Sequence, residues 1–393
     1  MKNILFVTSS DPRLSQEGHS QRTNLLWESL KGSGRVYTIV YDETYIGEPM
    51  AIEGEHPIFI FNSGMRKYTK KIKYFPHRIS SYLTRIIYLP TALPSEYTIN
   101  EIYKNTKFDL VVSRYVQIPA RYHLWNIAPL IIDFDDHPLQ VFDTMHKYNR
   151  PVILRPLAKF LLKQQLNKLI DKIEIGWLSN QFLITESSAK LVYLPNIPYH
   201  ISEFYNPKCT ERKYLFTIGL MSYEPNYKGV DAFLSNIWPI FHEKYPDIEY
   251  LIGGKGAPLK YVQKWERVDG VKYVGYVEDL AEAYKHCIAA IVPIYSGSGT
   301  CIKTLEAMAY SRVCISTPFG ARGFKEAQMS GKNGLLIFNN AREFINAYET
   351  IISTKKREDL EKRAKDFIDN NYSYKTFKSI VNRTLDTYFG DGK

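Results

Sequence analysis

Residues 289–316 read AAIVPIYSGSGTCIKTLEAMAYSRVCIS, and this stretch decides the fold class. The apolar run at 289–294 predicts a buried strand, and the Gly- and Ser-rich residues 296–300 predict a loop. A helix is expected at 302–310 and a second strand at 313–316. Strand, loop, helix and strand in this order are typical of a doubly wound parallel sheet. We therefore expect an α/β protein.

The same alternation recurs along the chain. Apolar runs predict further strands at 4–7, 35–41, 110–112, 129–134, 174–178, 189–194, 214–219, 249–254, 271–274 and 334–338. Helical patterns predict helices at 22–31, 154–171, 233–241, 280–286, 341–370 and 375–388. The stretch 198–212 has no periodicity and carries two prolines. It is the expected domain boundary.

Length and composition agree with a globular protein of two or three domains. The chain has 393 residues, of which 45% are hydrophobic and 23% charged. These values exclude wholesale disorder, collagen and low-complexity classes. The net charge of +10 favours anionic partners, namely nucleic acid, an acidic lipid surface or phosphorylated small molecules.

Cysteine usage and the apolar runs bear on the compartment. The four cysteines show no C-x-x-C spacing, which is typical of a reduced, cytoplasmic protein. The apolar run in MKNILFVTSSDPR is too short for a signal peptide, and no apolar run of transmembrane length occurs. We expect a cytoplasmic protein, peripheral on the inner face of the membrane at most.

The segment 66–85 is strongly basic and rich in aromatic residues. It carries seven Lys and Arg residues, and no acidic residue occurs between Glu55 and Glu96. Such a segment can lie on an anionic bilayer surface, which is the favoured interpretation. The alternatives are a solvated helix or loop that only adds charge, and a nucleic-acid-binding arm, for which no known motif is present.

The loop 296–300 and the helix after it form the strongest candidate site. Free backbone N–H groups and the positive end of a helix favour an anion there. Lys303 on the first helical turn would suit a phosphate, and the Glu306 carboxylate one turn on could accept two hydrogen bonds from a ribose diol. The alternative is a plain strand–turn–helix connection with both side chains in solvent. The spacing is not that of a P-loop.

Five collinear segments carry a family resemblance. The segment 296–323 reads SGSGTCIKTLEAMAYSRVCISTPFGARG, and the others are GLMSYEPNYKG (219–229), DIEYLIGGKG (247–256), VKYVGYVEDLAEAYKHCIAAIVPI (271–294) and GKNGLLIF (331–338). Together they resemble the donor-binding domain of retaining GT-B glycosyltransferases of family 4, which read G-S/G-G-T-R-L-K-x-L-E-A-M-A at the first of these segments. The match covers about residues 214–348, and the N-terminal half resembles the family less closely.

The resemblance implies the architecture and the reaction. It implies two Rossmann-like domains facing a central cleft: residues 1–200 for the acceptor, residues 201–372 for the nucleotide sugar, and a C-terminal helix at 373–393 that packs back on the first domain. The implied reaction moves a sugar from a nucleotide diphosphate to an acceptor with retention. Most members need no metal, so neither a metal nor another cofactor is expected.

Site residues on the donor side follow from the same alignment. Glu306 aligns with the second carboxylate of the family's Glu-x7-Glu pattern, which is implied to hold the ribose. Ser298 stands where the first carboxylate would be, so its hydroxyl and the amides of Gly299, Thr300 and Cys301 would contact the donor instead.

Two lysines and a glycine complete the implied donor site. Lys303 aligns with the lysine of the family motif, and Lys228 resembles the Lys-Gly of the first loop of the donor domain. Both are implied to bind the diphosphate, and the alternative for Lys228 is an exposed loop lysine. Gly254 ends the strand predicted at 249–254 and is included in the donor site.

The N-terminal domain is implied to receive the acceptor. The strand at 129–134 is followed by Asp135, Asp136 and His137, and Asp135 takes the place of a family His or Asp near the reacting sugar. A carboxylate there could orient an acceptor hydroxyl or stabilise positive charge on the sugar ring. Asp136 and His137 are candidates on the acceptor side. Asp136 could equally cap the next helix.

Two further residues lie after predicted strands of this domain. Arg114 could contact phosphate or acceptor, or could form a surface ion pair. Gly18 lies in the expected loop after the first strand, where the family brings backbone close to the diphosphate.

The predicted function is a retaining glycosyltransferase of bacterial surface polysaccharide synthesis, with Asp135, Lys303 and Glu306 as candidate catalytic residues. Its expected partners are a nucleotide sugar, a glycan or lipid-linked acceptor, and an anionic membrane through 66–85, but not nucleic acid. The alternatives are an epimerase with the same fold and a non-catalytic membrane scaffold, the latter suggested by the missing carboxylate at Ser298.

Overall fold

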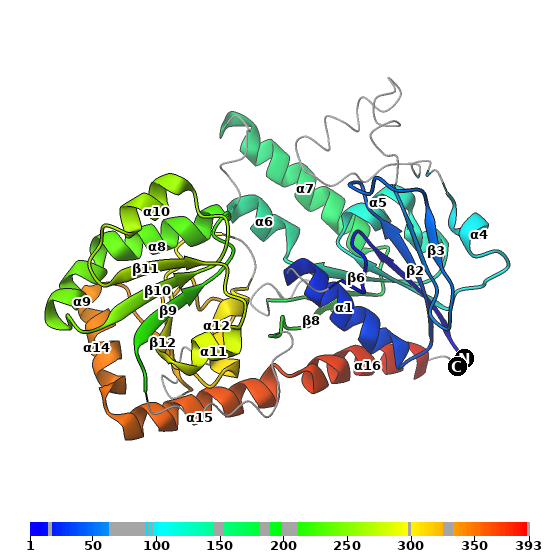
Figure 1. Ribbon diagram of the computed structural model, residues 1–393. Coiled ribbons are helices and arrows are strands. Elements are labelled where there is room, and N and C mark those ends of the chain that lie inside the picture. Colours follow the sequence, from blue (N-terminus) through cyan, green and yellow to red (C-terminus); the bar gives the residue numbers. More distant parts are fainter. Residues whose placement is uncertain are drawn as a thin grey trace. The chain divides into compact units, whose positions relative to one another are not determined.

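Figure 1 shows the computed structural model of the chain. It describes residues 1–14, 18–62, 92, 95, 97–144, 152–180, 189–198, 211–297, 300–324 and 333–390. The chain divides into two units. The first comprises Met1–Pro195 with Phe377–Lys393, and the second comprises Asn196–Thr376. The sequence-based boundaries were placed at 200 and 372, and the C-terminal helix groups with the first unit.

The first unit is built on an eight-stranded sheet with the order β3-β4-β2-β1-β5-β6-β7-β8. Its strands are β1 (Asn3–Thr8), β2 (Arg35–Tyr41), β3 (Met50–Ile52), β4 (Ile58–Phe61), β5 (Leu110–Arg114), β6 (Leu130–Asp135), β7 (Ile175–Leu178) and β8 (Leu191–Tyr193). Neighbouring strands are parallel except β3 and β4, which pair antiparallel at the edge. The parallel strands are continuous apolar runs because helices and loops cover both faces of such a sheet.

Helices of the first unit follow the strands. They are α1 (Gly18–Lys31), α4 (Ile99–Ile102), α5 (Gln117–Tyr122), α6 (Pro138–Thr144), α7 (Arg155–Ile170) and α16 (Tyr374–Gly390), with short 3₁₀ helices at Leu124–Asn126 and Val152–Leu154. Helix α16, at the red end of the colour bar, lies beside α1 in Figure 1. Trp177 of β7 donates a hydrogen bond from Nε1 to Thr384 Oγ1 of α16, at 3.3 Å. This contact ties the end of the chain to the first sheet.

The second unit has a six-stranded parallel sheet with the order β11-β10-β9-β12-β13-β14. Its strands are β9 (Tyr214–Ile218), β10 (Glu249–Gly253), β11 (Val271–Gly275), β12 (Cys287–Val292), β13 (Cys314–Ser316) and β14 (Leu335–Ile337). Its helices are α8 (Glu224–Asn236), α9 (Trp238–Lys244), α10 (Leu259–Trp265), α11 (Leu280–Lys285), α12 (Ile302–Ala309), α14 (Ala341–Ile352) and α15 (Thr354–Asn371). In chain order the strands run 3-2-1-4-5-6, the Rossmann arrangement.

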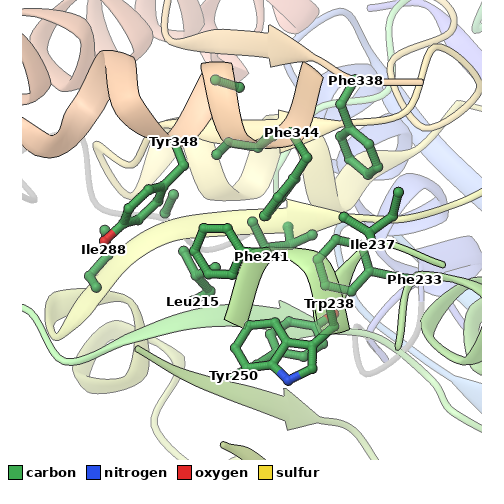
Figure 2. Close-up of a cluster of buried hydrophobic side chains, with 14 of the residues drawn as sticks. Leu215, Phe233, Ile237, Trp238, Phe241, Tyr250, Ile288, Phe338, Phe344 and Tyr348 are labelled. Carbon is green, nitrogen blue, oxygen red and sulfur yellow. The ribbon is translucent and has the colours of Figure 1, made fainter. Parts of the chain in front are cut away.

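The core of the second unit is rich in aromatic side chains (Figure 2). Phe241 of α9 meets Phe344 and Tyr348 of α14 edge-on, with ring centroids 5.1 and 4.9 Å apart. Phe233 packs against Tyr250 of β10 and is fully buried. Burial of such rings dominates the stability of a domain of this size. The rigid core fixes the loops at the strand ends, where ligands bind.

Most predicted strands are confirmed, with shifts of one or two residues at their ends. Two helix predictions are wrong. The helix expected at 233–241 joins the end of α8 to α9, which are separated at Ile237. The helix expected at 341–370 is two helices, α14 and α15, separated at Ser353. The backbone there is extended (φ −66°, ψ 116°), which interrupts helical hydrogen bonding. Strands β3 and β4 and helices α4, α5, α6 and α10 lie outside the predicted ranges. Among the described helices none has the length and apolarity needed to cross a membrane.

Candidate functional site

The second unit places its chemistry where its strand order reverses. Strands β9 and β12 are neighbours, although β10 and β11 lie between them in chain order, and the chain leaves them toward opposite sides of the sheet. Ligands of open α/β sheets bind at such a switch point, beyond the carboxyl ends of the strands. Gly219 follows β9, and the loop before α12 follows β12. The loop singled out from the sequence therefore lies at the position expected for a ligand.

Lys303 lies at this switch point and is held by a neighbouring side chain. Its Nζ donates a hydrogen bond to Asn226 Oδ1 at 2.8 Å. The amide of Asn226 in turn donates to the carbonyl of Leu220 at 2.8 Å. A Cβ atom added at Gly219 would lie 3.0 Å from Lys303 Cε and 3.1 Å from Asn226 Nδ2, so the loop after β9 packs closely on this pair. The ammonium group is thereby fixed at the N-terminal turn of α12.

Gly254 packs against the same loop. Its backbone has φ +120°, and a Cβ atom there would lie 1.7 Å from the carbonyl oxygen of Gly219. Only glycine permits this approach. The Gly254 carbonyl accepts a hydrogen bond from the Tyr273 hydroxyl at 2.6 Å. Gly254 thus lets the turns after β9 and β10 touch.

Glu306 lies one turn after Lys303 and is mostly buried. Burial raises the pKa of its carboxyl group, while the Tyr284 hydroxyl and the charge of Lys303 oppose that rise. The Tyr284 hydroxyl donates to Glu306 Oε1 at 3.1 Å. Among the described residues, no hydrogen bond is made to Oε2, so that oxygen is open to a ligand hydroxyl.

The start of α12 carries the other donor-side candidates. Cys301 is its N-cap residue and makes no side-chain capping bond. The Thr304 N–H donates to the Cys301 carbonyl at 3.1 Å, so the N–H groups that remain for another acceptor are those of the first two helical residues. Thr300 Oγ1 accepts a hydrogen bond from Asn196 Nδ2 at 2.9 Å. Ser298 and Gly299 lie outside the described residues.

Lys228 is separate from this group. It lies within α8 rather than in a loop, is about half exposed, and forms an ion pair with Glu224 one turn earlier. That partner raises the pKa of the Lys228 ammonium group through a hydrogen bond. The structure therefore brings together Lys303, Glu306 and Gly254, and gives Lys228 a local partner.

The first unit contains a cluster of four charged side chains at the ends of β5 and β6. Asp133 is completely buried and lies between two arginines: Arg22 donates to its Oδ1 at 2.7 Å and to its Oδ2 at 2.9 Å, and Arg114 donates to Oδ2. Burial alone would raise the pKa of Asp133, but the two guanidinium groups lower it below its ordinary value. Both arginines are themselves buried. Arg114 therefore forms a buried pair, not the surface pair considered from the sequence.

Asp135 completes the charge balance of this cluster. Its carboxylate oxygens lie 3.6 Å from Arg114 and 3.9 Å from Arg22, and its side chain is 20% exposed. Its backbone has φ +59°, and the β6–β7 pairing shifts register between Asp133 and Asp135. Strained backbone and bulges concentrate at functional sites. Two arginines and two aspartates sum to zero charge, which accounts for the tolerance of so much charge in the interior.

Asp136 and His137 lead into α6. His137 Nδ1 accepts a hydrogen bond from the Leu139 N–H at 3.3 Å, so the imidazole contacts the first turn of the helix. Burial lowers the pKa of His137 below its ordinary value. A ring nitrogen that accepts a hydrogen bond must be unprotonated, which agrees with that direction.

Gly18 and the basic segment 66–85 were also predicted to contribute to function. Gly18 is the first residue of α1 rather than part of a loop, because the helix begins earlier than the pattern at 22–31 indicates. The basic segment 66–85 lies outside the described residues. Among the described side chains, no group of three His, Cys, Asp or Glu residues is arranged to hold a metal ion.

Residues 212–354 match the family described as "Glycosyl transferases group 1". This range covers the switch point, Asn226, Lys303 and Glu306. The second unit therefore carries a glycosyltransferase group 1 domain.

Solved structures of the same fold match nearly the whole chain. Sucrose-phosphate synthase from Thermosynechococcus elongatus is 14% identical, with a TM-score of 0.68, over 99% of this chain and all of that one. A glycosyltransferase from Rickettsia africae is 15% identical, with a TM-score of 0.63, over all of this chain and 99% of that one. HepE from Anabaena, in complex with UDP-glucose, is 13% identical, with a TM-score of 0.61, over 98% of this chain and all of that one. At these identities the likeness shows the fold.

A relative in sequence is a Klebsiella pneumoniae protein named "Uncharacterized 44.6 kDa protein in cps region". It is 22% identical over 325 residues, which are 77% of this chain and 80% of that one.

Three residues of these sites were not singled out from the sequence: Arg22, Asp133 and Asn226. Asp133 carried a signal, since a carboxylate inside a buried apolar strand must have a charged partner. Arg22 is 111 residues away from it in the chain, so no local pattern could name that partner. Asn226 carried no such signal, because asparagine is common in loops and helix starts.

Proposed function

We propose that the second unit binds a nucleotide-diphosphate sugar and that the protein transfers the sugar, with retention, to a glycan or lipid-linked acceptor of bacterial surface polysaccharide. Capsule, O-antigen and exopolysaccharide are the classes concerned. The observation that carries the proposal is the position of Lys303 beside Asn226 and Gly219, at the switch point of the unit that matches the group 1 family.

The donor would bind along the start of α12. The Lys303 ammonium group and the N–H groups of the first two residues of α12 would bind the diphosphate. Glu306 Oε2 would accept a hydrogen bond from a ribose hydroxyl, while Tyr284 holds the other oxygen. The Ser298 hydroxyl and the amides of Gly299, Thr300 and Cys301 would contact the sugar. In this proposal Lys228 has a secondary role at most, because Glu224 already balances its charge.

The same groups would assist departure of the nucleotide. Negative charge develops on the diphosphate as its bond to the sugar breaks, and a preorganised cation and helix N–H groups stabilise that charge. We propose that no metal ion is required for this step. Activity that persists in EDTA would agree with this, whereas activity that EDTA abolishes and Mg²⁺ restores would contradict it.

The acceptor would bind the first unit near Asp135. A carboxylate that is partly exposed at a strand end, with strained backbone, can orient an acceptor hydroxyl or stabilise positive charge on the sugar ring. Arg22, Arg114 and Asp133 would hold that carboxylate in place. Asp136 and His137 lie beside it and are candidates for contact with the acceptor.

Relatives support the choice of substrate class. HepE has been solved with UDP, with UDP and glucose, and with UDP-glucose. The Klebsiella pneumoniae relative is named for a cps region, which supports a polysaccharide acceptor. We propose in addition that the protein works in the cytoplasm and that residues 66–85 contact the inner face of the membrane.

The proposal is tested by following donor sugars by ¹H NMR. The purified chain is incubated with UDP-, GDP-, ADP- and CMP-sugars, with and without glycan acceptors, and the anomeric proton of the product is assigned. Release of one nucleotide together with a product that keeps the donor's anomeric configuration supports the proposal. A product of opposite configuration contradicts retention, and no turnover of any donor contradicts the catalytic role and favours a scaffold.

A further inference from the structure

The first unit contains a cavity of about 430 Å³. Its wall includes Tyr41, Glu43, Tyr115, Gln117, Arg121 and Tyr122. The volume lies in the lower part of the range for small-molecule sites, about 300–1,000 Å³. None of the candidate site residues discussed above forms its wall.

The cavity lies at the switch point of the first sheet. Strands β1 and β5 are neighbours in the middle of the order, and the chain departs from them toward opposite edges. Ser9 follows β1, Tyr115 follows β5, and Tyr41 ends β2, and all three line the cavity. By the same rule that applies to the second unit, this is where an open α/β sheet binds a ligand.

Tyr115 connects the cavity to Asp135. The Tyr115 hydroxyl accepts a hydrogen bond from Arg114 at 2.7 Å, and the same guanidinium nitrogen lies 3.6 Å from Asp135 Oδ2. Tyr115 and Asp135 both have positive φ, +61° and +59°. A positive φ is a true outlier for a bulky residue such as tyrosine and persists only where the surroundings impose it. A molecule in the cavity would therefore lie one side chain away from the carboxylate proposed to act on the acceptor.

The wall combines aromatic rings with hydrogen-bonding groups. Tyr41 and Tyr122 stack with ring centroids 4.7 Å apart, and Tyr115 supplies a third ring. Gln117 and the pair Arg121–Glu43, joined at 2.9 Å, provide planar donors and acceptors. A sugar ring presents C–H groups to aromatic faces and hydroxyl groups to such polar side chains. The lining thus matches a sugar better than a purely apolar or purely ionic ligand.

The charge of the wall selects among sugars. Glu43 neutralises Arg121, and Asp42 adds a further carboxylate that accepts from the Thr44 N–H at 2.8 Å and the Thr44 hydroxyl at 2.6 Å. These three charged groups sum to one negative charge. A phosphate or a sugar carboxylate would meet a wall of its own sign with no uncompensated cation.

We propose that this cavity binds the uncharged terminal sugar of the acceptor glycan. The inference rests on the proposed glycosyltransferase function, which it deepens by naming the class of the acceptor's end. Any phosphate or diphosphate of a lipid-linked acceptor would then lie outside the cavity, with at least one neutral residue between it and the transfer point.

The test uses saturation-transfer difference NMR on the full chain without nucleotide. The probes are methyl α-glucoside, methyl β-galactoside and methyl N-acetyl-β-glucosaminide, with methyl β-glucuronide and glucose 6-phosphate as anionic counterparts. We expect signals from at least one neutral glycoside. We expect both anionic probes to bind with a dissociation constant at least tenfold higher than that of this neutral glycoside. Stronger binding of an anionic probe, or no binding of any neutral glycoside, overturns the proposal.

Two variants locate the binding and a third controls for charge. Gln117→Ala should weaken the binding of the neutral glycoside about tenfold, because the site loses hydrogen bonds to the sugar. Glu43→Gln removes the counter-charge of Arg121 and should strengthen the binding of methyl β-glucuronide about tenfold. Glu48→Gln removes an exposed carboxylate of the same segment that does not line the cavity. It should change neither the affinity for the neutral glycoside nor that for methyl β-glucuronide. If Gln117→Ala and Glu43→Gln both behave as the wild type, the sugar binds elsewhere and the proposal fails.

A parallel titration with UDP, GDP, ADP and CMP separates this inference from the function on which it rests. Nucleotide binding without the expected sugar selectivity overturns the inference alone. Selective sugar binding in the cavity without binding of any nucleotide contradicts the proposed function and leaves a sugar-binding site in the first unit.

Discussion

Lys303 and Asn226 meet across the switch point of the second sheet, with Nζ 2.8 Å from Oδ1. Lys303 lies in the first turn of the helix after β12 and Asn226 in the helix after β9, so their contact joins the two connections that diverge there. Asn226 fixes the ammonium group without neutralising it, because an amide carries no charge. A cation held in this way remains available to an anionic ligand.

Asn226→Ala should therefore weaken the binding of a nucleoside diphosphate by about tenfold. The expected cause is the loss of the group that orients Lys303, since a hydrogen bond to a charged group contributes about 1.5–3 kcal/mol. Calorimetric titration of the variant measures the effect. Asn236→Ala, on the exposed end of the same helix, is the matched control and should bind as the wild type does. Equal affinities for Asn226→Ala and the wild type would show that Lys303 needs no support.

Asp133→Asn should lower the free energy of unfolding by about 3–5 kcal/mol, because it leaves Arg22 and Arg114 buried without their shared counter-ion. Urea unfolding followed by circular dichroism measures the change. The control is Asp143→Asn, which breaks an exposed pair with Lys159 and should cost about 0–1 kcal/mol. Similar costs for the two variants would mean that the buried cluster contributes no more than a surface pair.

Gly254→Ala should destabilise the protein more than Gly54→Ala does. Both glycines have positive φ, so both variants incur backbone strain of about 1–3 kcal/mol. Only at Gly254 does the new Cβ meet backbone, the carbonyl oxygen of Gly219, whereas nothing lies within 4 Å at Gly54. Thermal unfolding with and without nucleotide compares them. If Gly54→Ala destabilised the protein as much, the close approach of the two turns would not be the reason for the glycine.

His137 should make stability depend on pH below its ordinary pKa of about 6.5. Burial lowers the pKa of His137 in the folded protein, so the unfolded chain binds more protons in the window just below 6.5. Its contribution to the free energy of unfolding is therefore present above about pH 6.5 and is lost as pH falls through the lowered pKa. His137→Asn should show a shallower loss of stability on acidification than the wild type. His56, whose pKa burial also lowers, titrates in both proteins and cancels in the comparison.

Much of the fold could be predicted because parallel strands covered on both faces are continuous apolar runs. The runs at 4–7, 35–41 and 289–294 correspond to β1, β2 and β12. Strand β4 was missed although Ile58–Phe61 is apolar, since a run of four residues does not distinguish a strand from a loop anchor. Ser353 was missed as a break because the apolar pattern continues on both sides of it.

Sites whose residues are close together in the chain could be predicted, and sites whose residues are distant in the chain could not. The loop before α12 could be found from the sequence because its glycines, lysine and glutamate lie within eleven residues of one another. The cavity of the first unit could not, because its wall comes from the ends of β1, β2 and β5, which are distant in the chain. The charged cluster is likewise assembled only in the folded chain: the sheet brings Arg114 beside Asp133 in register, and Arg22 contacts Asp133 from α1.

The most direct test of the central claim is calorimetric titration of the full chain with UDP, GDP, ADP and CMP, repeated on Lys303→Met. The matched control is Lys272→Met, which removes an exposed lysine paired with Glu249 in the same unit. We expect one diphosphate to bind the wild type and the control equally and Lys303→Met at least tenfold more weakly, since a charge-assisted contact is lost. Equal affinity for Lys303→Met and Lys272→Met, or no binding of any nucleotide by the wild type, would contradict a donor site at the start of α12.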